Sequence, residues 1–428
     1  MKTLLKNLNI IAPHQKLSQK ADIVIEDGKI SFVGKVDEKN SFDKIYDFDG
    51  KYCSIGFFDM HVHLREPGRE DEETIETGCE SAAAGGFTGV LCMPNTDPCI
   101  DDAETVKYII DRAKEQLVDV YPAAAATKER KGESISPMLE LAKMGAKAFT
   151  DDGAAIKTAK ILRIAMEYSL MTDCPIIEHC EEDSLSGGAM NESFNSTLLG
   201  LPTMPSISEE LIVMRDIMMA EFTGARLHIA HISTKKSVEY VRLAKQKGIK
   251  VTAEVAPHHF TLTDDELKTY DTNYKMNPPL RTQEDIDAII EGLADGTIDA
   301  IATDHAPHTP EEKDLEFIYA PNGIVGLETA FALAISELYK KKKLSLEQLI
   351  EKFAINPRKI LNIPLPKIEI GQKANLTIFD PELIWTVDAS KFKSKCNNTP
   401  FDKRLVSGKS IATINNSKIY FEGKYSNI

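Results

Sequence analysis

The chain has 428 residues, of which 42% are hydrophobic and 27% charged, as expected for a globular protein with one large domain and a smaller one. Its net charge of -15 argues against nucleic acid and anionic membrane surfaces as partners. No stretch approaches the ~18 apolar residues that span a bilayer, and the N-terminus lacks the pattern of a signal peptide. Seven cysteines without C-x-x-C spacing predict reduced thiols in a cytoplasmic protein.

Both ends of the chain have the pattern of β-strands. Residues 21–35, ADIVIEDGKISFVGK, alternate in polarity on either side of Asp27-Gly28, which predicts a β-hairpin. A second hairpin, SIATINNSKIYFEGK, is predicted to turn near Asn415-Asn416, and KANLTIFDP predicts a further strand. We therefore expect residues 1–55 and 363–428 to form two halves of one small β domain.

Residues 56–362 alternate short apolar runs with helical patterns. The runs lie within CSIGFFDMHVHL, GFTGVLCMPNT, VDVYPAAAAT, GAKAFTDDG, CPIIEHCEE, ARLHIAHIST, KVTAEVAPHH and IDAIATDHAPH. Eight consecutive βα units predict a TIM-type (β/α)8 barrel. A doubly wound open sheet is the alternative, but no glycine-rich nucleotide fingerprint follows the first strand.

Six of these runs end in polar residues suited to metal binding or acid–base chemistry. They are His61, His63 and Arg65; Asn95; Asp151 and Asp152; His179; His231; and Asp304, with His305 and His308 just beyond. One such residue alone is more often a structural histidine or a helix N-cap. Their recurrence at the carboxyl ends of successive strands, where barrels place active sites, favours one shared site.

Side-chain alternation predicts which residues point inward, because residues two apart on a strand share a face. On the first strand it places His61, His63 and Arg65 on one face and Met60, Val62 and Leu64 on the other. On the fourth strand it places Ala148, Thr150 and Asp152 together. The small residues of that set suit a crowded interior, which favours Asp152 over Asp151 as the inward ligand. Lys147 is predicted to be solvated or salt-bridged.

Four imidazoles and two carboxylates at one barrel mouth suit a divalent metal such as zinc, which prefers nitrogen and oxygen donors. Six ligands exceed the needs of one tetrahedral zinc with an open position. They fit two metals that share a bridging carboxylate. Such a pair activates water and polarises a carbonyl, so the pattern predicts metal-assisted hydrolysis.

Several motifs together resemble the dihydroorotases of the longer bacterial type, in the amidohydrolase superfamily. They are HVHLREPG, MPNT, FTDDG, HISTKKSV, Thr252–Glu254 with the following Pro-His-His, NYKMNPPLR, TDHAPH and GIVGLET. The resemblance extends to NTPF at Asn398–Phe401 and covers nearly the whole chain. It implies a TIM-type barrel with a small composite β domain. The implied reaction is the reversible interconversion of dihydroorotate and N-carbamoyl-aspartate in pyrimidine biosynthesis.

The resemblance also implies a role for each matching residue. The first metal would be bound by His61, His63 and Asp304, the second by His179 and His231, and both by the bridging Asp152. Asp304 would be the general base that moves a proton from water to the leaving nitrogen. Contacts with the substrate are expected from His63, Arg65, Asn95, Asn277, His308, Asn322 and Gly323.

Two of these residues have simpler interpretations. Arg65 could bind the substrate carboxylate bidentately, but it could equally form a surface salt bridge with Glu66 or Glu70. Asn277 could be an ordinary turn residue before Pro278.

The segment TPEEKDLEFIYAPNG, residues 309–323, is long and charged and is predicted to be a mobile lid beside the site. The family commonly has an aromatic residue at the position of Asn322, whose backbone, with that of Gly323, is expected to contact the substrate.

Two rival functions stay open from the sequence. A hydantoinase or allantoinase would be expected to carry a bridging lysine on the fourth strand. A non-catalytic structural partner of aspartate transcarbamoylase would be expected to have lost metal ligands, and none is lost here. For an active enzyme, we consider a homodimer and an association with aspartate transcarbamoylase.

Overall fold

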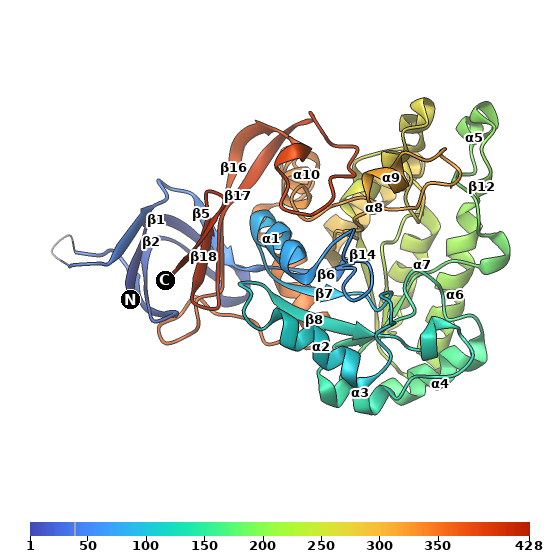
Figure 1. Ribbon diagram of the computed structural model, residues 1–428, viewed down its shortest axis with the longest axis horizontal. Helices are drawn as coiled ribbons and strands as arrows, with labels where there is room; N and C mark the ends of the chain where they lie inside the picture. Colours follow the sequence, from blue (N-terminus) through green and yellow to red (C-terminus); the bar gives the residue numbers. More distant parts are fainter. Residues whose placement is uncertain (38–39) are drawn as a thin grey trace.

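The computed structural model describes residues 1–37 and 40–428. A β-rich part that holds both chain termini lies beside a larger part in which parallel strands alternate with helices (Figure 1). Within the described residues, no helix combines the length and the apolar character needed to cross a membrane.

The β-rich part is built from both ends of the chain. Its strands are β1 (Lys2–Ala12), β2 (Leu17–Glu26), β3 (Lys29–Gly34), β4 (Lys44–Asp47), β5 (Tyr52–Ile55), β16 (Leu376–Thr386), β17 (Leu405–Asn415), β18 (Lys418–Phe421) and β19 (Lys424–Asn427). They form one sheet in the order β19-β18-β17-β16-β5-β1-β2-β3, with β4 also paired to β1. The antiparallel pair β5–β16 joins the two ends of the chain. This confirms the composite β fold, while the domain boundaries at 55/56 and 362/363 stay predictions.

Both predicted hairpins are present. The N-terminal hairpin, β2–β3, turns at Asp27-Gly28 as predicted. The C-terminal hairpin, β17–β18, turns at Asn416-Ser417, one residue later than predicted, and these residues have φ of 48° and 58°. Such left-handed angles belong to two-residue hairpin turns, and asparagine adopts them at low cost.

The larger part is a barrel of eight parallel strands. They are β6 (Phe57–Val62), β7 (Phe87–Cys92), β8 (Asp119–Ala124), β9 (Ala148–Phe149), β10 (Ile176–Glu178), β13 (Leu227–Ile229), β14 (Val251–Val255) and β15 (Ala300–Ile301). Neighbours in the sheet follow chain order from β6 to β15. The first and last strands meet where His63 N donates to His305 O at 2.8 Å. The (β/α)8 prediction is therefore confirmed, and the open-sheet alternative is wrong.

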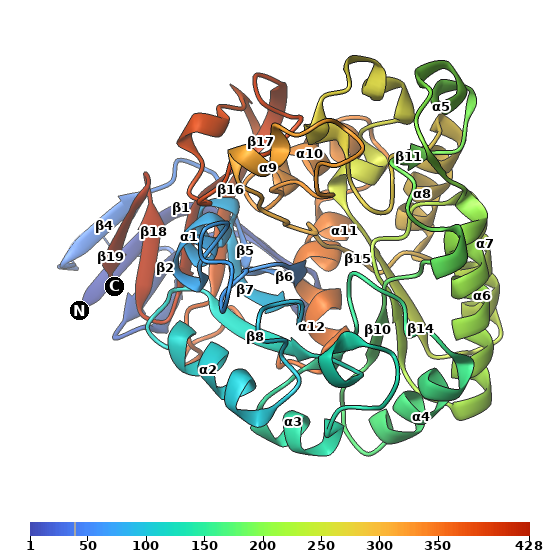
Figure 2. The ribbon, with the colours of Figure 1, turned by 45° about the vertical axis from the view of Figure 1, so that its right-hand side comes forward.

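Helices surround this sheet (Figure 2). They are α1 (Ile75–Gly85), α2 (Ala103–Ala113), α3 (Met138–Met144), α4 (Ala159–Ser169), α6 (Ser206–Thr223), α7 (Lys235–Gln246), α8 (Gln283–Asp295), α10 (Ala330–Ala334), α11 (Leu346–Ile350) and α12 (Asn356–Ile360). Between β10 and α6 the chain adds β11 (Met190–Asn191), α5 (Phe194–Leu199) and β12 (Thr203–Met204), which the sequence analysis did not predict. A ring cluster of Phe57, Phe331 and Phe379 packs the barrel against the β-rich part, with centroids 5.0 to 5.9 Å apart.

The first barrel strand contains a β-bulge that changes the predicted direction of one side chain. Asp59 pairs with Val90, but Val62 pairs with Cys92, so β6 has one more residue than β7 over this stretch. Met60 consequently packs in the apolar cluster inside the barrel, while Val62 packs in the outer cluster. The prediction that Met60 shares the face of Val62 is wrong, because alternation is interrupted at the bulge.

The Asp59 side chain supports this bulge and closes the barrel. Its carboxylate accepts hydrogen bonds from His61 N at 3.1 Å and from Thr303 N at 3.1 and 3.2 Å. Thr303 follows the last strand, β15, so one buried carboxylate connects the first strand with the last.

We predict that Asp59→Ala destabilises the protein. Two buried backbone N–H groups would lose their acceptor, which costs about 1–3 kcal/mol each. The free energy of unfolding should fall by about 2–6 kcal/mol in urea denaturation. Asp111→Ala, which removes an exposed carboxylate from the last turn of α2, is the matched control and should leave stability nearly unchanged. An Asp59→Ala variant as stable as the wild type would refute this role.

Candidate active site and metal centre

The side chains predicted as metal ligands meet at the carboxyl end of the barrel. All are buried: His61, His63, Asp152, His179, His231 and Asp304. Asp152 lies at the centre of the group. The distances from its carboxylate oxygens to ring nitrogens are 3.3 Å to His61, 3.6 Å to His231, 3.7 Å to His63 and 3.8 Å to His179. The Asp304 carboxylate lies 3.0 Å from His63 Nε2 and 3.7 Å from His61 Nε2.

The two aspartates of the DDG motif point in different directions. Asp151 turns away from the histidines, and its Oδ1 accepts a hydrogen bond from Thr127 N at 2.9 Å. Ala148 packs inside the barrel, and Asp152, four residues on, points to the same side. The alternation rule thus gives the observed direction for Asp152.

Three site residues have a backbone conformation that is rare outside glycine. The φ angles are 61° at Arg65, 29° at His231 and 50° at Asp304. Each residue follows the end of a barrel strand, so the chain leaves the strand abruptly and turns the side chain over the mouth. Strained backbone of this kind concentrates at functional sites.

The outer ring nitrogens of three histidines are held by neighbouring side chains. His61 Nδ1 lies 2.7 Å from Glu254 Oε1, His63 Nδ1 lies 2.8 Å from Asn95 Oδ1, and His179 Nε2 lies 2.8 Å from Glu181 Oε2. In each ring the other nitrogen faces the Asp152 region. Metal-ligating histidines characteristically have this arrangement, because the outer bond fixes both the ring orientation and the tautomer.

The inner atoms of the cluster fit a metal as well. Among the described residues, His61 Nε2 and Asp152 Oδ1 are buried without a formed hydrogen bond. Leaving such atoms unpaired costs about 1–3 kcal/mol each, and a bound cation would satisfy both. Two overlapping donor groups, His61/His63/Asp304 and His61/Asp152/His231, each lie within the reach of one ion.

Electrostatics favour the ionised form of both carboxylates. Burial by itself raises the pKa of Asp304, but the hydrogen bond with His63 and the charge of His61 lower it below the ordinary value. The pKa of Asp152 is lowered in the same way, against burial and chiefly by His61. Both groups therefore offer anionic oxygens to a divalent cation near neutral pH.

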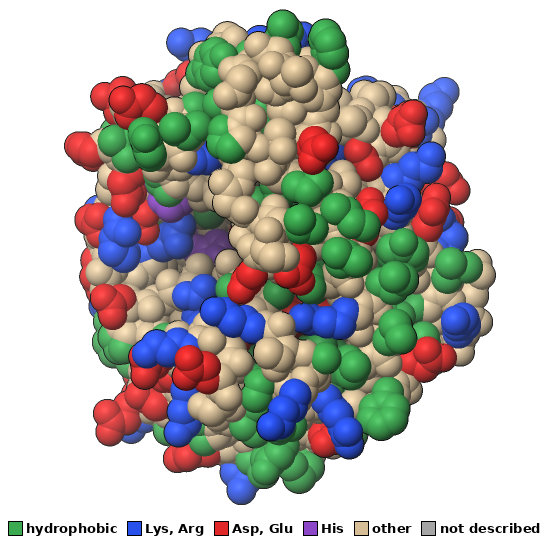
Figure 3. Space-filling view, turned by 90° about the vertical axis from the view of Figure 1, so that its right-hand side faces the viewer, with side chains coloured by type: hydrophobic (Ala, Val, Ile, Leu, Met, Phe, Trp, Pro, Cys, Tyr) green, Lys and Arg blue, Asp and Glu red, His purple; other side chains and the backbone are tan. Residues whose placement is uncertain are grey.

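The proposed substrate side of the site is a cavity of about 240 Å³. Its lining includes His63, Arg65, Asn95, Asp152, His179, His231, Asn277, Asp304, His308, Asn322 and Gly323. In Figure 3, histidine side chains are visible at the base of a hollow with Lys and Arg side chains near its rim. A larger cavity of about 660 Å³ lies between α1, α10 and the β16–β18 strands, away from the histidine cluster.

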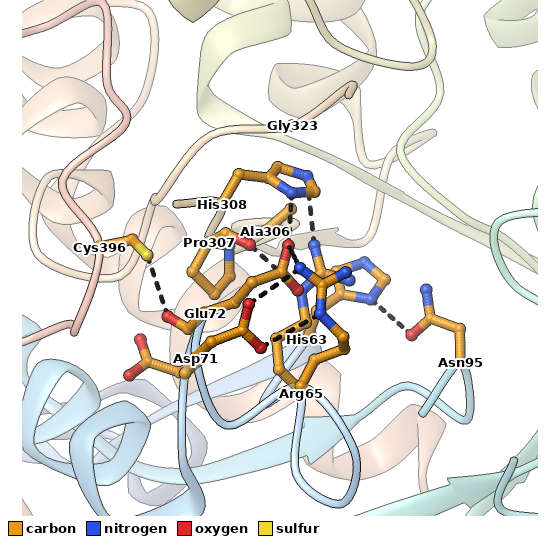
Figure 4. Close-up of polar contacts among 12 residues, drawn as sticks. His63, Arg65, Asp71, Glu72, Asn95, Ala306, Pro307, His308, Gly323 and Cys396 are labelled. Atoms are coloured by element: carbon orange, nitrogen blue, oxygen red, sulfur yellow. Dashed lines mark hydrogen bonds and ion pairs between the residues drawn. The ribbon is translucent and has the colours of Figure 1, made fainter. Parts of the chain in front are cut away.

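Arg65 is held by a buried carboxylate that the sequence analysis missed (Figure 4). Glu72 Oε2 lies 3.0 Å from Arg65 Nε, and Glu72 Oε1 lies 2.7 Å from His308 Nδ1. Arg65 does not pair with Glu66 or Glu70, because Glu66 binds Arg112 at 2.8 Å and the Arg65 side chain is only 11% exposed. The surface salt-bridge alternative is therefore wrong.

Glu72, His308 and Glu312 also form a group close enough to hold a metal. Arg65 pairs with Glu72, and Arg69 pairs with both carboxylates, at 3.4 Å to Glu72 and 2.6 Å to Glu312. Two guanidinium groups thus stand where a cation would have to approach, and this group is better described as an anchor for Arg65 and His308.

Of two further residues that the sequence analysis named, Asn277 lies in the cavity and His305 lies outside it. Asn277 lines the cavity and its Nδ2 donates to Glu181 Oε2 at 2.7 Å, so it does more than form a turn. His305 points away from the cavity, where its Nδ1 accepts a hydrogen bond from Gly326 N and its Nε2 lies 3.3 Å from Glu73.

The sequence analysis also gave no role to Glu254, although a charged residue within a predicted barrel strand could have indicated one. It is the one charged residue of β14, and it is buried there. Its second oxygen lies 3.3 Å from His228 Nε2, and His228 Nδ1 lies 2.8 Å from Thr252 Oγ1. A buried polar layer therefore lies beneath His61.

The segment 309–323 begins with the short helix α9 (Pro310–Lys313). Two buried lysines bind its carbonyl groups. Lys275 Nζ donates to Ile318 O and Ala320 O, and Lys313 Nζ donates to Pro321 O at 3.0 Å and Gly323 O at 3.1 Å. The structure thus gives this segment an ordered arrangement, and its predicted role as a mobile lid stays a prediction.

A parallel barrel whose mouth gathers this set of histidines and aspartates has the donors that metal-assisted hydrolysis requires. Residues 50–237 match the model of the family described as Dihydro-orotase-like. The chain is 47% identical to the dihydroorotase of Acetivibrio thermocellus over 423 residues, covering 98% of this chain and 99% of that protein. It is also 47% identical to the dihydroorotase of Pelotomaculum thermopropionicum, with 99% of each chain covered.

Solved structures agree on the fold. The L-hydantoinase of Arthrobacter aurescens matches with a TM-score of 0.86 at 24% identity, covering 100% of this chain and 97% of that one. The dihydropyrimidinase of Brevibacillus agri matches with a TM-score of 0.83 at 21% identity, covering 99% and 95%. The sequence relationships are much closer, and the chain belongs to the dihydroorotase family.

We predict that Lys313 makes stability depend on pH. Burial lowers the pKa of Lys313 from its ordinary value of 10.5 to about 7. Between these values the unfolded chain binds a proton that the folded chain does not, so stability increases as pH rises through this range. The free energy of unfolding of the wild type, relative to Lys313→Met, should increase between pH 7 and about pH 9.5 by at most ~1.4 kcal/mol per pH unit.

Urea denaturation of both proteins across this pH range measures the difference. Lys107→Met, which replaces an exposed lysine on α2, is the control and should show no such trend. Parallel curves for the wild type and Lys313→Met would contradict the prediction.

Proposed function

We propose that this protein is a dihydroorotase, which reversibly hydrolyses (S)-dihydroorotate to N-carbamoyl-L-aspartate in pyrimidine biosynthesis. The observation that carries the proposal is Arg65, held by Glu72 in the same cavity as the histidine–aspartate cluster. Dihydroorotate combines a carboxylate with a cyclic amide. An arginine beside a metal centre provides for both groups. The family of the chain supports the same reaction.

We propose zinc as the metal, in one or two sites, because the donors are imidazoles and carboxylates. His61, His63 and Asp304 would hold one ion, His179 and His231 the other, with Asp152 shared. When bound, zinc would supply activation of water and polarisation of the substrate carbonyl.

The chain's own residues would orient the substrate and move the proton. Arg65 is proposed to bind the substrate carboxylate, assisted by His308, whose Nε2 lies 3.3 Å from Arg65 Nη2. Asn95 and Asn277 have carboxamide groups at the cavity wall that can orient the ring. Asn322 and Gly323 line the same cavity and are proposed to contribute backbone groups.

Asp304 is the proposed general base. Its carboxylate would accept a proton as the water oxygen bonds to the ring carbonyl carbon, and would give that proton to the ring nitrogen as the C–N bond breaks. The reverse reaction would use the same group in the opposite order. Asp304 is suited to this role because it is buried beside His63 and also lines the substrate cavity.

The rival functions are less well supported. A cyclic-amide hydrolase of the hydantoinase type is expected to use a bridging lysine, but the inward groups of this strand are Ala148 and Asp152. The non-catalytic alternative is disfavoured because all six donors are present and converge. Cytoplasmic location, a homodimer and an association with aspartate transcarbamoylase remain proposals. Light scattering of the purified chain, alone and mixed with transcarbamoylase, tests the last two.

The proposed function predicts that purified protein with about one to two zinc ions per chain hydrolyses dihydroorotate at mildly alkaline pH. The loss of ultraviolet absorbance measures turnover, and elemental analysis of the same sample measures metal. His61→Ala should lose turnover and at least one zinc ion, because His61 belongs to both donor groups. His14→Ala, a histidine outside the cavity, should lose neither.

The outcomes separate the rival functions. Turnover of hydantoin or allantoin without turnover of dihydroorotate would favour the hydantoinase-like alternative. Metal-free protein that hydrolyses none of these compounds and binds aspartate transcarbamoylase would favour the structural role.

A further prediction of the proposed function concerns Arg65→Lys. Lysine keeps the positive charge but cannot bind a carboxylate with two parallel N–H groups. The loss of one charged hydrogen bond, about 1.5–3 kcal/mol, should raise KM for dihydroorotate about 10- to 100-fold, with a smaller change in kcat and unchanged zinc content. Arg112→Lys, which changes an exposed arginine paired with Glu66, is the control. An unaltered KM would show that Arg65 does not bind the substrate carboxylate.

A further inference from the structure

The chain between β16 and β17 crosses beside the barrel mouth. We call residues 393–398 the strap. Backbone N–H groups at its start donate to Glu328 Oε1, 2.6 Å from Lys393 N and 3.2 Å from Ser394 N. Further along, Lys395 N donates to Glu73 Oε1 at 3.1 Å. Cys396 Sγ lies 3.1 Å from the backbone oxygen of Glu72, the residue whose side chain holds Arg65 (Figure 4). The strap is therefore fixed to the loop that follows the first barrel strand.

The strap ends at Asn398, whose buried side chain reaches the loop after the last barrel strand. Its Nδ2 donates to Ala306 O at 3.1 Å and to Gly323 O at 3.1 Å. Its Oδ1 accepts a hydrogen bond from His308 N at 3.1 Å. One carboxamide thus uses both of its donors and its acceptor within a single loop.

These three bonds join the two ends of the loop 306–323. Ala306 and His308 lie at its start, and Gly323 lies at its end. A fourth contact closes the same ends, because His308 Nε2 lies 2.8 Å from Asn322 O. The two ends of the loop are therefore held together at the edge of the cavity. His308, Asn322 and Gly323, the proposed substrate contacts, line the cavity at this edge.

An asparagine is well suited to this position. The site requires two donors for carbonyl oxygens and one acceptor for an N–H group. Aspartate has nearly the same shape but would place a carboxylate against two carbonyl oxygens. Alanine would leave Ala306 O and His308 N unpaired, and Gly323 O would keep only its bond from Lys313 Nζ.

We propose that Asn398 is a positioning residue for the substrate-binding edge of the active site. Through it, the strap between two strands of the β-rich part holds the loop 306–323 in its binding conformation. Asn398 lines no part of the cavity itself and would act through His308, Asn322 and Gly323. The inference rests on the proposed function, because that function identifies the substrate. The expected effect of Asn398 on the loop is independent of the substrate.

The test compares Asn398→Ala, Asn398→Asp and the control Asn397→Ala with the wild type. Asn397 is the preceding residue of the strap, has the same side chain and is exposed. Each protein is assayed for kcat and KM with dihydroorotate, for zinc content, for thermal unfolding, and for hydrogen exchange of peptides that cover residues 306–323.

We expect both Asn398 variants to raise KM about tenfold or more while kcat changes less, with zinc content unchanged. Hydrogen exchange should be faster in 306–323 and unchanged in the barrel strands. Asn397→Ala should match the wild type in every measurement. A purely structural role would instead lower the unfolding temperature and reduce zinc content and kcat together, without a selective rise in KM.

Unchanged KM and unchanged exchange in both Asn398 variants would overturn the inference. A fall in kcat together with loss of zinc would overturn it as well. If the wild type does not hydrolyse dihydroorotate, the proposed function fails. The exchange comparison then still decides whether Asn398 fixes the loop. If Asn398→Asp does not fold, Asn398→Ala decides on the same measurements.

Discussion

The direction of His61 at the barrel mouth depends on the bulge in β6, which is held by one buried carboxylate, that of Asp59. It binds the backbone of the bulge in β6 and the backbone just after β15. Because a strand alternates its side chains, a β6 without the bulge would send His61 to the side opposite Met60. Met60 fills the barrel interior, so His61 would then face the surrounding helices. The bulge allows the strand to contribute an apolar side chain to the core and, directly after it, two histidines to the mouth.

The same reasoning explains where sequence prediction succeeded and where it failed. Alternation was sufficient at the fourth strand, where Ala148 packs inside the barrel and Asp152 faces the mouth. It failed at Met60 because the residue types of β6 do not indicate the extra residue in its pairing with β7. The sixth strand departs as well: Ala230 packs inside the barrel, yet the adjacent His231 also faces the mouth, with φ of 29°. Bulges and left-handed residues are properties of the folded backbone, and the alternation of side chains along a strand does not predict them.

Residues that act through other residues were harder to predict than those at the centre. Glu72, Glu181, Glu254 and Asn398 are far from their partners in sequence or lie in ordinary-looking loops. The family resemblance marked the NTPF segment without giving it a role. The contacts of Asn398 with Ala306 and Gly323 become visible only when the strap and the loop are placed together. The β-rich part is thus more than an attachment to the barrel, because it supports the substrate side of the site.

The supporting carboxylates of Glu72 and Glu254 have a common role in the electrostatics of the site. The protein carries a net charge of -15, and its proposed substrate is also an anion. Attraction must therefore be local, from Arg65 and from the proposed metal ions, and these cations must be kept at fixed positions within a buried site. Glu72 fixes Arg65 and His308, while Glu254 fixes His61. A carboxylate of this kind stabilises a buried cation and also orients it, because the hydrogen bond that pairs the charge fixes the direction of the side chain. In this site the buried acidic residues create the conditions under which an acidic protein can bind an acidic substrate.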